Sequence, residues 1–372
     1  TNYKRSELLA KETGADIPVY MDFDEMIKVA NPDTVIITTK DNTHHEYIVK
    51  ALDAGCDVIV EKPMTIDTPQ CKEIFEAEKR SGKKVIVTFN LRFAPFSTRL
   101  RELIQEGAVG EVLSIHFEWF LDTRHGADYF RRWHRKKENS GGLLIHKATH
   151  HFDLVNWIIG EEPVHVNAFG SLRVYGPTRE ERGTRCLTCQ YKGTCEYYFD
   201  ISSDERVKKL YLDCEDVDGY YRDSCIFSEE INIEDSASVS VKYSGGAIMS
   251  YSLTAHSPFE GYRMVINGTK GRLQAENLHG GVGSFKGEHI QNVKIYNRKE
   301  EELSIKIPTA TGSHGGGDER IRNMLFRGYT EDPLGFIAGS KQGANSILIG
   351  IAANRSMKEG RSIPIKELMG DM

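Results

Sequence analysis

The 372-residue sequence lacks the features that mark membrane-spanning and nucleic-acid-binding proteins. No apolar stretch approaches the roughly 20 residues that cross a bilayer, and the opening residues TNYKRSELLA contain no apolar signal-peptide region. Lys and Arg number 48 against 54 Asp and Glu, and the two signs are interspersed without a basic stripe. We therefore expect a small-molecule ligand, with neither nucleic acid nor a membrane as partner.

The sequence also lacks the G-x-G-x-x-G turn that follows the first strand of a dinucleotide-binding fold. It opens instead on a helical pattern, and helical segments then alternate with the apolar runs TVIITT, DVIVEKP and KVIVTFN. This alternation predicts a doubly wound α/β domain with a parallel sheet over residues 1–90, incomplete at its start. We interpret the chain as beginning inside a longer protein, so a cytoplasmic location is expected and a periplasmic one stays open.

Polar residues follow each of these three predicted strands, at the edge where parallel sheets bind ligands. The most informative is Lys62, because an ammonium whose stem packs among apolar neighbours has a lowered pKa and can hold a hydroxyl or transfer a proton. An ion pair with Glu61 that caps the strand is the structural alternative. Pro63 fixes the following turn, with a cis peptide bond as one option. The residues at these strand ends are Thr38, Thr39, Glu61, Lys62, Pro63 and Asn90.

Residues 91–372 have a different pattern, in which long alternating strands such as EVLSIHFEWF and SASVSVKYSG predominate. They predict an α+β domain with a large, mostly antiparallel open sheet that has helices on one face. The polar segment of about 176–230 has the character of an insertion. Because an open sheet face needs covering, we expect a homodimer or homotetramer.

The segment SGGLLIHKATHHFDLVNWIIG predicts a helix with His146 and His150 four residues apart on one face. Asp153 lies one turn beyond His150 and would fix the tautomer of its imidazole. Such a pair of histidines suits proton transfer, but metal ligation and satisfied core histidines are alternatives.

Seven cysteines are too few for a disulfide scaffold in a chain of this length, but five of them crowd into residues 186–225. The spacing C-x2-C-x5-C, completed by a downstream cysteine, matches a structural zinc site that would stabilise the insertion. An iron–sulfur cluster and free thiols are the alternatives. The predicted ligands are Cys186, Cys189, Cys195 and Cys225.

With these motifs in view, the chain resembles the Gfo/Idh/MocA family of NAD(P)-dependent oxidoreductases, which act on sugars, inositols and related polyols. The resemblance covers nearly the whole chain and is carried by TTKDNTHHEYIVKALDAGCDVIVEKPM, by NLRFAP with IQEGAVGEV, by SGGLLIHKATHHFD and by NGTKGRL. It implies a Rossmann-like N-terminal domain whose glycine-rich turn is not seen here.

The family resemblance also implies roles for particular residues. Lys62, in the E-K-P motif, would polarise the reacting hydroxyl, and His150 would be the general base of the family's D-x-x-x-H helix. His146 stands where that motif has its acid, so His146 would tune or replace His150, and an anionic sugar becomes a more plausible substrate. Lys40 departs from the usual proline of the cofactor loop. The residues implied in cofactor binding are Thr38, Thr39, His44, Glu61, Lys62, Pro63, Asn90 and Arg92.

These observations predict hydride transfer between a sugar or polyol carbon and NAD or NADP. An NAD-dependent glycosidase or lyase that oxidises its sugar only transiently is an alternative, distinguished by the absence of NADH build-up. A non-catalytic sugar-binding relative is another. The loop GSHGGGDERI would let a ligand approach the backbone closely. Candidate substrate contacts are Trp133, His134, Thr149, Asp153, His314 and Asp318.

Overall fold

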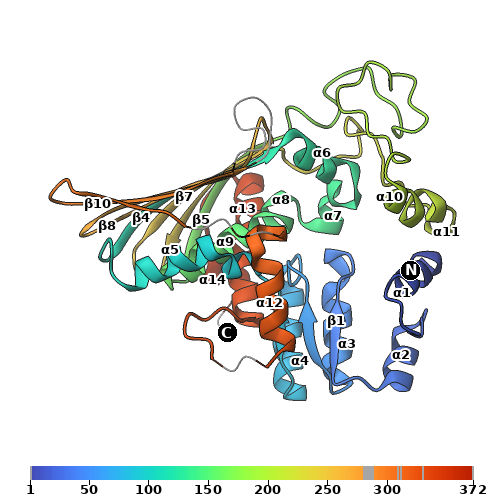
Figure 1. The fold of residues 1–372 in the computed structure, drawn as a ribbon, viewed down its shortest axis with the longest axis horizontal. Coiled ribbons are helices and arrows are strands. Elements are labelled where there is room, and N and C mark those ends of the chain that lie inside the picture. Colours follow the sequence, from blue (N-terminus) through green and yellow to red (C-terminus); the bar gives the residue numbers. More distant parts are fainter. Residues whose placement is uncertain (1, 280–288, 308–309, 311, 329–330, 371–372) are drawn as a thin grey trace.

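The computed structural model describes residues 2–279, 289–307, 310, 312–328 and 331–370. These residues form two sheets, one of four strands and one of nine. The small sheet and its helices lie below helix α9 (Ala148–Ile159) and the end of helix α13 (Ser340–Glu359). The large sheet extends to one side above them (Figure 1).

The small sheet contains three parallel strands in the order β1 (Thr34–Ile37), β2 (Asp57–Val60) and β3 (Val85–Val87). Helices α3 (His44–Asp53) and α4 (Thr68–Ser81) connect them. The sequence specifies α4 closely, because the Asp67 side chain accepts a hydrogen bond from the Gln70 amide and Gly82 ends the helix at a φ of 69°. The predicted parallel sheet is confirmed.

A fourth strand, β12 (Ala338–Gly339), joins this sheet from the far end of the chain. It pairs antiparallel with β3, where Ala338 lies opposite Val87. No strand pattern is visible in two residues, so only the folded chain reveals this addition.

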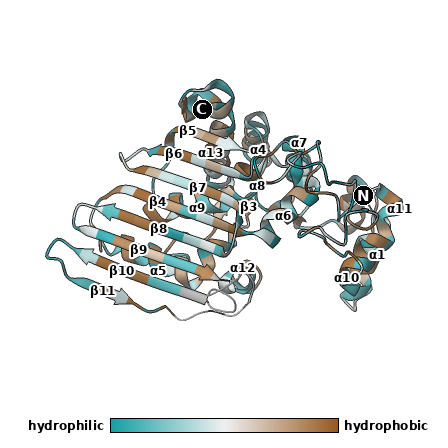
Figure 2. Ribbon diagram, turned by 90° about the horizontal axis from the view of Figure 1, so that it is seen from above, coloured by the Kyte–Doolittle hydropathy of each residue, from teal (hydrophilic) through white to brown (hydrophobic). Residues whose placement is uncertain are grey.

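The large sheet runs in the order β11-β10-β9-β8-β4-β7-β6-β5-β13. All neighbouring strands are antiparallel except β4 and β7, which are parallel, so the predicted mostly antiparallel sheet is also confirmed. Figure 2 looks onto this sheet. The bounds are β4 (Val112–Asp122), β5 (Pro163–Ser171), β6 (Ser236–Tyr243), β7 (Ile248–Ser257), β8 (Glu260–Gly268), β9 (Gly271–His279), β10 (His289–Asn297), β11 (Glu302–Ile305) and β13 (Ile363–Pro364).

Helices α5 (Pro95–Gln105), α9 (Ala148–Ile159) and α13 (Ser340–Glu359) lie on one face of the large sheet (Figure 1). Helix α13 belongs to both hydrophobic cores, since Ile347 packs in the core of the small sheet and Ala352 in that of the large sheet. A single apolar helix thus ties the two sheets together, and the cavity described below lies at their junction.

The segment of about 176–230 holds the short helices α10 (Glu205–Leu210) and α11 (Glu215–Asp218). Helix α1 (Tyr3–Glu12) lies beside α11, where Lys4 forms an ion pair of 2.6 Å with Asp216 (Figure 1). Within the segment, the Arg185 guanidinium bonds to both Glu215 and the fully buried Asp223. Ion pairs therefore connect parts of this segment that are distant in sequence.

The remaining elements are short or lie at the rim of the cavity. Among the described residues, no helix combines the length and the apolar character that a membrane crossing requires. The remaining helices are α2 (Phe23–Ala30), α6 (Thr123–Arg131), α7 (Lys137–Ser140), α8 (Leu143–His146), α12 (Gly317–Phe326) and α14 (Ile365–Met369), and the single 3-10 turns are η1 (Asp41–Thr43), η2 (Asn90–Phe93), η3 (Trp133–Arg135), η4 (Leu212–Cys214) and η6 (Ser313–Gly316).

Candidate active site

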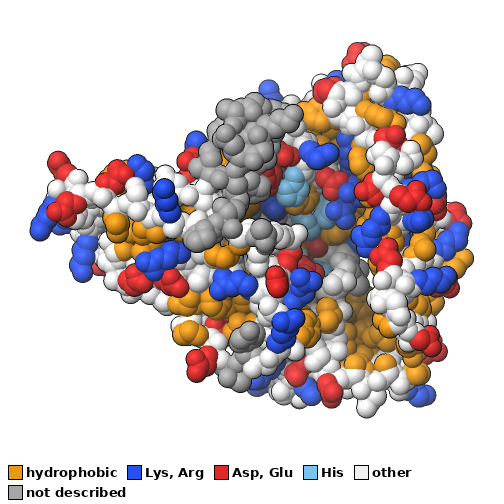
Figure 3. Space-filling view, in the orientation of Figure 1, with side chains coloured by type: hydrophobic (Ala, Val, Ile, Leu, Met, Phe, Trp, Pro, Cys, Tyr) orange, Lys and Arg blue, Asp and Glu red, His pale blue; other side chains and the backbone are white. Residues whose placement is uncertain are grey.

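A cavity of about 780 Å³ lies at the carboxyl ends of the parallel strands. Figure 3 shows histidine side chains inside a hollow, with charged side chains of both signs at its rim. The cavity is lined from the small sheet by Glu61, Lys62 and Asn90, and from the other side by His150 and His314. Residues that are far apart in the sequence therefore meet where a doubly wound sheet binds its ligands.

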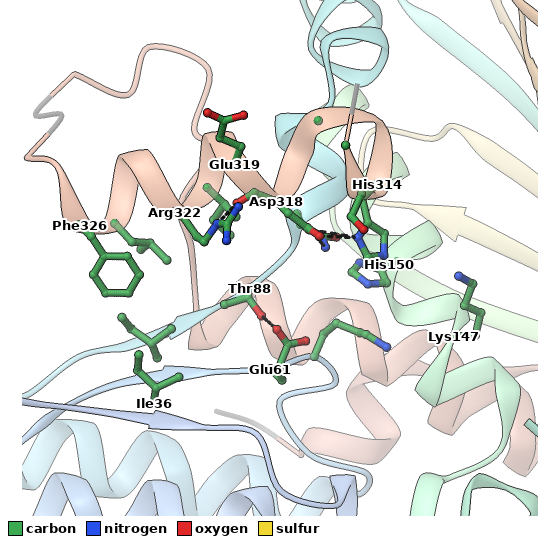
Figure 4. A pocket seen from close by; sticks show the side chains of 18 of the residues that line it. Ile36, Glu61, Thr88, Lys147, His150, His314, Asp318, Glu319, Arg322 and Phe326 are labelled. Atoms are coloured by element: carbon green, nitrogen blue, oxygen red, sulfur yellow. Dashed lines mark hydrogen bonds and ion pairs between the residues drawn. The ribbon is translucent and has the colours of Figure 1, made fainter. Parts of the chain in front are cut away.

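Lys62 follows β2 and precedes a cis peptide bond to Pro63. Its Nζ donates a hydrogen bond of 3.1 Å to the main-chain oxygen of His146. Burial lowers the pKa of Lys62, and the carboxylates of Asp41 and Glu61 oppose this shift. The structural alternative, an ion pair of Lys62 with Glu61, is not formed as a direct contact, because Glu61 accepts a hydrogen bond of 3.0 Å from Thr88 instead (Figure 4).

His150 lies on α9 and is buried, with its ring 6.1 Å from that of Phe89 and 6.2 Å from that of His314. Burial and then the charges of Lys62 and Lys147 hold its pKa well below the usual range. Its imidazole is therefore neutral at pH 7 and able to accept a proton. Its Nδ1 is enclosed and has no hydrogen-bond partner in the described part of the chain.

His314 and Asp318 lie on the opposite wall, in the glycine-rich loop and the first turn of α12. His314 Nδ1 is 3.0 Å from Asp318 Oδ1, and this oxygen accepts a hydrogen bond of 2.6 Å from the Asn90 amide. The glycines permit the sharp turn, since Gly315 and Gly316 have φ angles of 61° and 83°. The structure thus brings three predicted site residues into one hydrogen-bonded group (Figure 4).

The predicted continuous helix is interrupted at Lys147, between α8 and α9, and His146 does not line the cavity that His150 lines. The His146 Nδ1 lies 2.6 Å from Oδ2 of the buried Asp41, and its ring is 4.2 Å from that of His134. Asp41 was not predicted from the sequence, although it lies in the loop after β1, next to the expected cofactor residues Thr38 and Thr39. A carboxylate is therefore present near the altered motif, but it contacts His146 and not His150.

Three other expectations are corrected by the hydrogen bonds. Asp153 does not orient His150, because both its oxygens bond to Arg92 at 2.7 and 2.5 Å inside the core. Arg92 is consequently bonded inside the protein core, and its guanidinium is not directed into the cofactor crevice. Thr149 is fully buried and pairs with Ser346 of α13 at 2.8 Å. Its hydroxyl is thus directed into the helix interface and not toward a substrate.

Trp133 and His134 stack on each other at 3.8 Å and join the His146 cluster. Neither lines the main cavity. Burial, followed by the charge of Arg132, lowers the pKa of His134 to about 2, so its ring stays neutral. The rings of both residues pack against the ring of His146.

Residues of the expected cofactor loop lie at the end of β1. Thr38 and Thr39 are exposed there, and Thr39 accepts a hydrogen bond of 2.9 Å from Thr43. His44 is buried and bridges two loops, with Nδ1 2.8 Å from the Pro63 oxygen and Nε2 3.1 Å from the Thr39 oxygen. His44 therefore holds the β1 and β2 loops in register.

A second histidine–carboxylate pair, not predicted from the sequence, lies beside the cavity, and its histidine lines the wall. His125 lies on α6 with Nδ1 3.0 Å from Glu260 and Nε2 3.0 Å from the Tyr129 hydroxyl. Burial opposes the ionised form of Glu260, but hydrogen bonding from His125 keeps its pKa below the usual range. His125 and Glu260 lie in segments without a recognisable motif, so only the fold brings them together.

The four predicted zinc ligands line one narrow pocket of the insertion. Yet in the described ranges no group of three or more His, Cys, Asp or Glu side chains is placed to hold a metal ion. Cys186 instead accepts a hydrogen bond of 3.1 Å from Arg131, and Cys195 one of 2.9 Å from Arg179. All seven cysteines are free, so the structure does not support the zinc prediction.

The fold and the cavity define a dinucleotide-binding sheet joined to a large open sheet that closes one side of the crevice. The sequence profile described as "Oxidoreductase family, NAD-binding Rossmann fold" matches residues 1–89, and "Oxidoreductase family, C-terminal alpha/beta domain" matches residues 101–366. The chain belongs to the Gfo/Idh/MocA family of NAD(P)-dependent oxidoreductases.

Individual relatives agree with this assignment. The Bacillus subtilis (strain 168) protein YteT is 42% identical over 95% of this chain and 86% of its own length. The myo-inositol 2-dehydrogenase of Thermotoga maritima is 23% identical over 94% of this chain and 85% of its own. Among solved structures, an NAD-binding oxidoreductase from Klebsiella pneumoniae has the same fold, with a TM-score of 0.68 at 16% identity over 96% of this chain and 86% of that one.

Proposed function

We propose that the protein transfers a hydride between a hydroxyl-bearing carbon of a sugar or polyol and NAD or NADP. The observation that carries this proposal is the common cavity of Lys62 and His150 at the carboxyl ends of the parallel strands. One residue is an ammonium and the other a neutral imidazole, the two groups that alcohol oxidation needs.

The cofactor fits the residues of this crevice. The buried Asn90 Oδ1 has no hydrogen-bond partner among the described residues, so it is an acceptor available to a ribose hydroxyl. Thr39, Glu61 and Asn90 would hold the nicotinamide end, and NAD(P), when bound, takes up the hydride.

The reaction removes a hydride from carbon and a proton from the hydroxyl, and leaves a carbonyl group. Lys62 donates a hydrogen bond to the reacting oxygen and stabilises the negative charge that develops there. His150 accepts the hydroxyl proton at Nε2, since Nδ1 is enclosed by protein. Its low basicity favours rapid loss of the proton again.

His314 provides the next acceptor for that proton. Its ring lies 6.2 Å from the ring of His150, and its side chain is 44% exposed. Asp318 holds Nδ1 and orients the imidazole. His314 and Asp318 thus connect the buried base with solvent, a role that replaces the acid missing at position 146.

The test uses the full-length protein with NAD and NADP and a panel of sugars and polyols, with NADH or NADPH formation as readout. Lys62→Met and His150→Ala should each lower kcat/KM by about 10²–10⁴-fold while NADH still quenches Trp119, Trp133 and Trp157 fluorescence. Lys341→Met is the matched control, because Lys341 is a surface lysine paired with Glu162.

Undiminished activity in Lys62→Met or His150→Ala would refute the assigned roles. Substrate consumption without accumulation of reduced cofactor would instead indicate the redox-neutral cleavage reaction. Binding of sugar without any turnover would indicate a non-catalytic relative.

A further inference from the structure

Lys147 is a buried cation whose charge is not neutralised by direct contact with any side chain of the described residues. It joins α8 to α9 and is only 8% exposed. Its Nζ lies 5.4 Å from the ring centroid of Trp119, and none of the described residues forms a hydrogen bond or ion pair with it. Figure 4 shows its side chain reaching into the cavity beside His150 and His314.

We infer that Lys147 binds a carboxylate of the substrate, and that the substrate is a sugar acid of the uronate or aldonate class. This inference rests on the proposed function and specifies its substrate. A buried ammonium is costly unless it is paired. The buried ammonium of Lys147 lines the cavity, where a bound substrate would supply the anion that the protein does not.

The carboxylates near Lys147 already have other partners. Glu260 accepts hydrogen bonds from the Asp122 amide at 2.8 Å and lies 3.0 Å from His125, although its charge still attracts Lys147. Asp318 is bonded to Asn90 and His314, and Glu61 to Thr88. The other titratable groups that line this cavity are Lys62, His125, Tyr129, His150, His314, Glu319 and Arg322. Glu319 also lines the cavity, but it is exposed and points away from Lys147 (Figure 4). In the described ranges, no carboxylate of the cavity lining therefore pairs with the ammonium.

The position of Lys147 also suits a substrate that reaches both reactive groups. A second chamber of about 560 Å³ extends under the large sheet and is lined by Trp119, Glu260, Asn277 and Gln291. Lys147, His125 and His150 line both chambers. A sugar acid can thus place its reacting hydroxyl at Lys62 and His150, and its carboxylate at the junction with the second chamber.

A carboxylate fits this place better than a phosphate. No arginine lines the second chamber among its described residues, and Lys147 is its one lysine there. Phosphate sites in proteins commonly combine arginines, backbone amides or a helix N-terminus. One ammonium, beside the amide side chains of Asn277 and Gln291 and the hydrogen-bonded carboxylate of Glu260, matches one negative charge on a ring that also carries hydroxyl groups.

Burial, with the charge of Lys62, lowers the pKa of Lys147 to about 8, against the attraction of Glu260. The ammonium is consequently charged at pH 7 and titrates within a measurable range. Binding of an anion should therefore weaken as the pH rises above about 8.

The experiment compares sugars that differ only in the acid group. Affinities of the full-length protein with NADH bound are measured by tryptophan fluorescence for D-galacturonate against D-galactose, D-glucuronate against D-glucose, and D-gluconate against D-glucitol. We expect at least one acid to bind tenfold or more tightly than its neutral partner at pH 7. This ratio should fall to about one in Lys147→Met, recover in part in Lys147→Arg, and stay unchanged in Lys341→Met.

The inference is overturned if no acid binds more tightly than its neutral partner, if the ratio survives in Lys147→Met, or if D-galactose 6-phosphate binds more tightly than D-galacturonate. The proposed function fails separately. Selective binding of an acid without NADH formation in the forward assay would refute the oxidoreductase and keep the carboxylate site. Turnover of neutral sugars without preference for acids would refute the carboxylate site and keep the oxidoreductase.

Discussion

The ion pair between Arg92 and Asp153 separates a structural role for Asp153 from a catalytic one. The two side chains are 3% and 2% exposed, and Arg92 also donates a hydrogen bond of 3.0 Å to the Gly335 oxygen. Asp153→Asn keeps the size of the side chain but leaves the guanidinium buried without a counter-charge. Breaking such a pair costs about 3–5 kcal/mol of unfolding free energy.

This cost can be converted into a melting temperature. An unfolding entropy of about 2.1 cal/mol/K per residue gives about 0.8 kcal/mol/K for the 372 residues. The variant should therefore melt about 4–6 °C below the wild type in calorimetry. The control Asp53→Asn removes an exposed pair with Arg80 and should change the unfolding free energy by less than about 1 kcal/mol.

The activity of the same variant provides the decisive comparison. Because Asp153 contacts Arg92 and not His150, kcat/KM at 25 °C and its pH profile should stay close to the wild type. A loss of 10²-fold or more, with a shifted pH profile and an unchanged melting temperature, would refute this reasoning and give Asp153 the role of orienting the base. Replacing both charges, in Arg92→Met with Asp153→Leu, should restore part of the lost stability.

Three further predictions concern other parts of the chain. Lys147→Met should raise the unfolding free energy at pH 7 by about 3 kcal/mol, because the buried lysine has its pKa lowered from 10.5 to about 8. The folded and the unfolded chain both hold the Lys147 proton below pH 8, so the full gain in unfolding free energy is present there. This gain should shrink as the pH rises from 8 to 10.5, and a gain that stays constant would contradict the lowered pKa. Cys186→Ser should lower the unfolding free energy by about 1 kcal/mol through its weaker contact with Arg131, without a change in metal content. One zinc ion per chain, lost in that variant, would reinstate the metal site. Phe169 is 76% exposed on β5, so Phe169→Asp should shift the expected homo-oligomer toward monomer in sedimentation velocity, and an unchanged profile would place the interface elsewhere.

The contact between Asp41 and His146 brings a carboxylate to the position where the D-x-x-x-H motif is altered. In this chain the carboxylate comes from the loop after β1, at a hydrogen-bond distance of 2.6 Å from the substituted position. Burial raises the pKa of Asp41 and lowers that of His146, so both shifts oppose a charge-separated pair at this position. The positive charges of Lys62 and Lys147 therefore dominate the field at His150, which agrees with an anionic substrate.

The sequence by itself determined the parallel strands, the open antiparallel sheet and the polar residues at the strand ends. These features follow from local periodicity and from motifs of adjacent residues, such as Glu61, Lys62 and Pro63, and local signals need no distant partner to be interpreted. His150 was identified for the same reason, since its motif spans only five residues of sequence, although the helix is interrupted within it.

Only the tertiary structure decided which of these side chains meet. Asn90 contacts Asp318 across 228 residues of sequence, and His146 contacts Asp41 across 105. Asp153 was assigned to His150 because the two are one turn apart, but packing between helices paired it with Arg92 instead. Contacts of this kind depend on how elements pack against each other, and packing leaves no periodic pattern in the sequence.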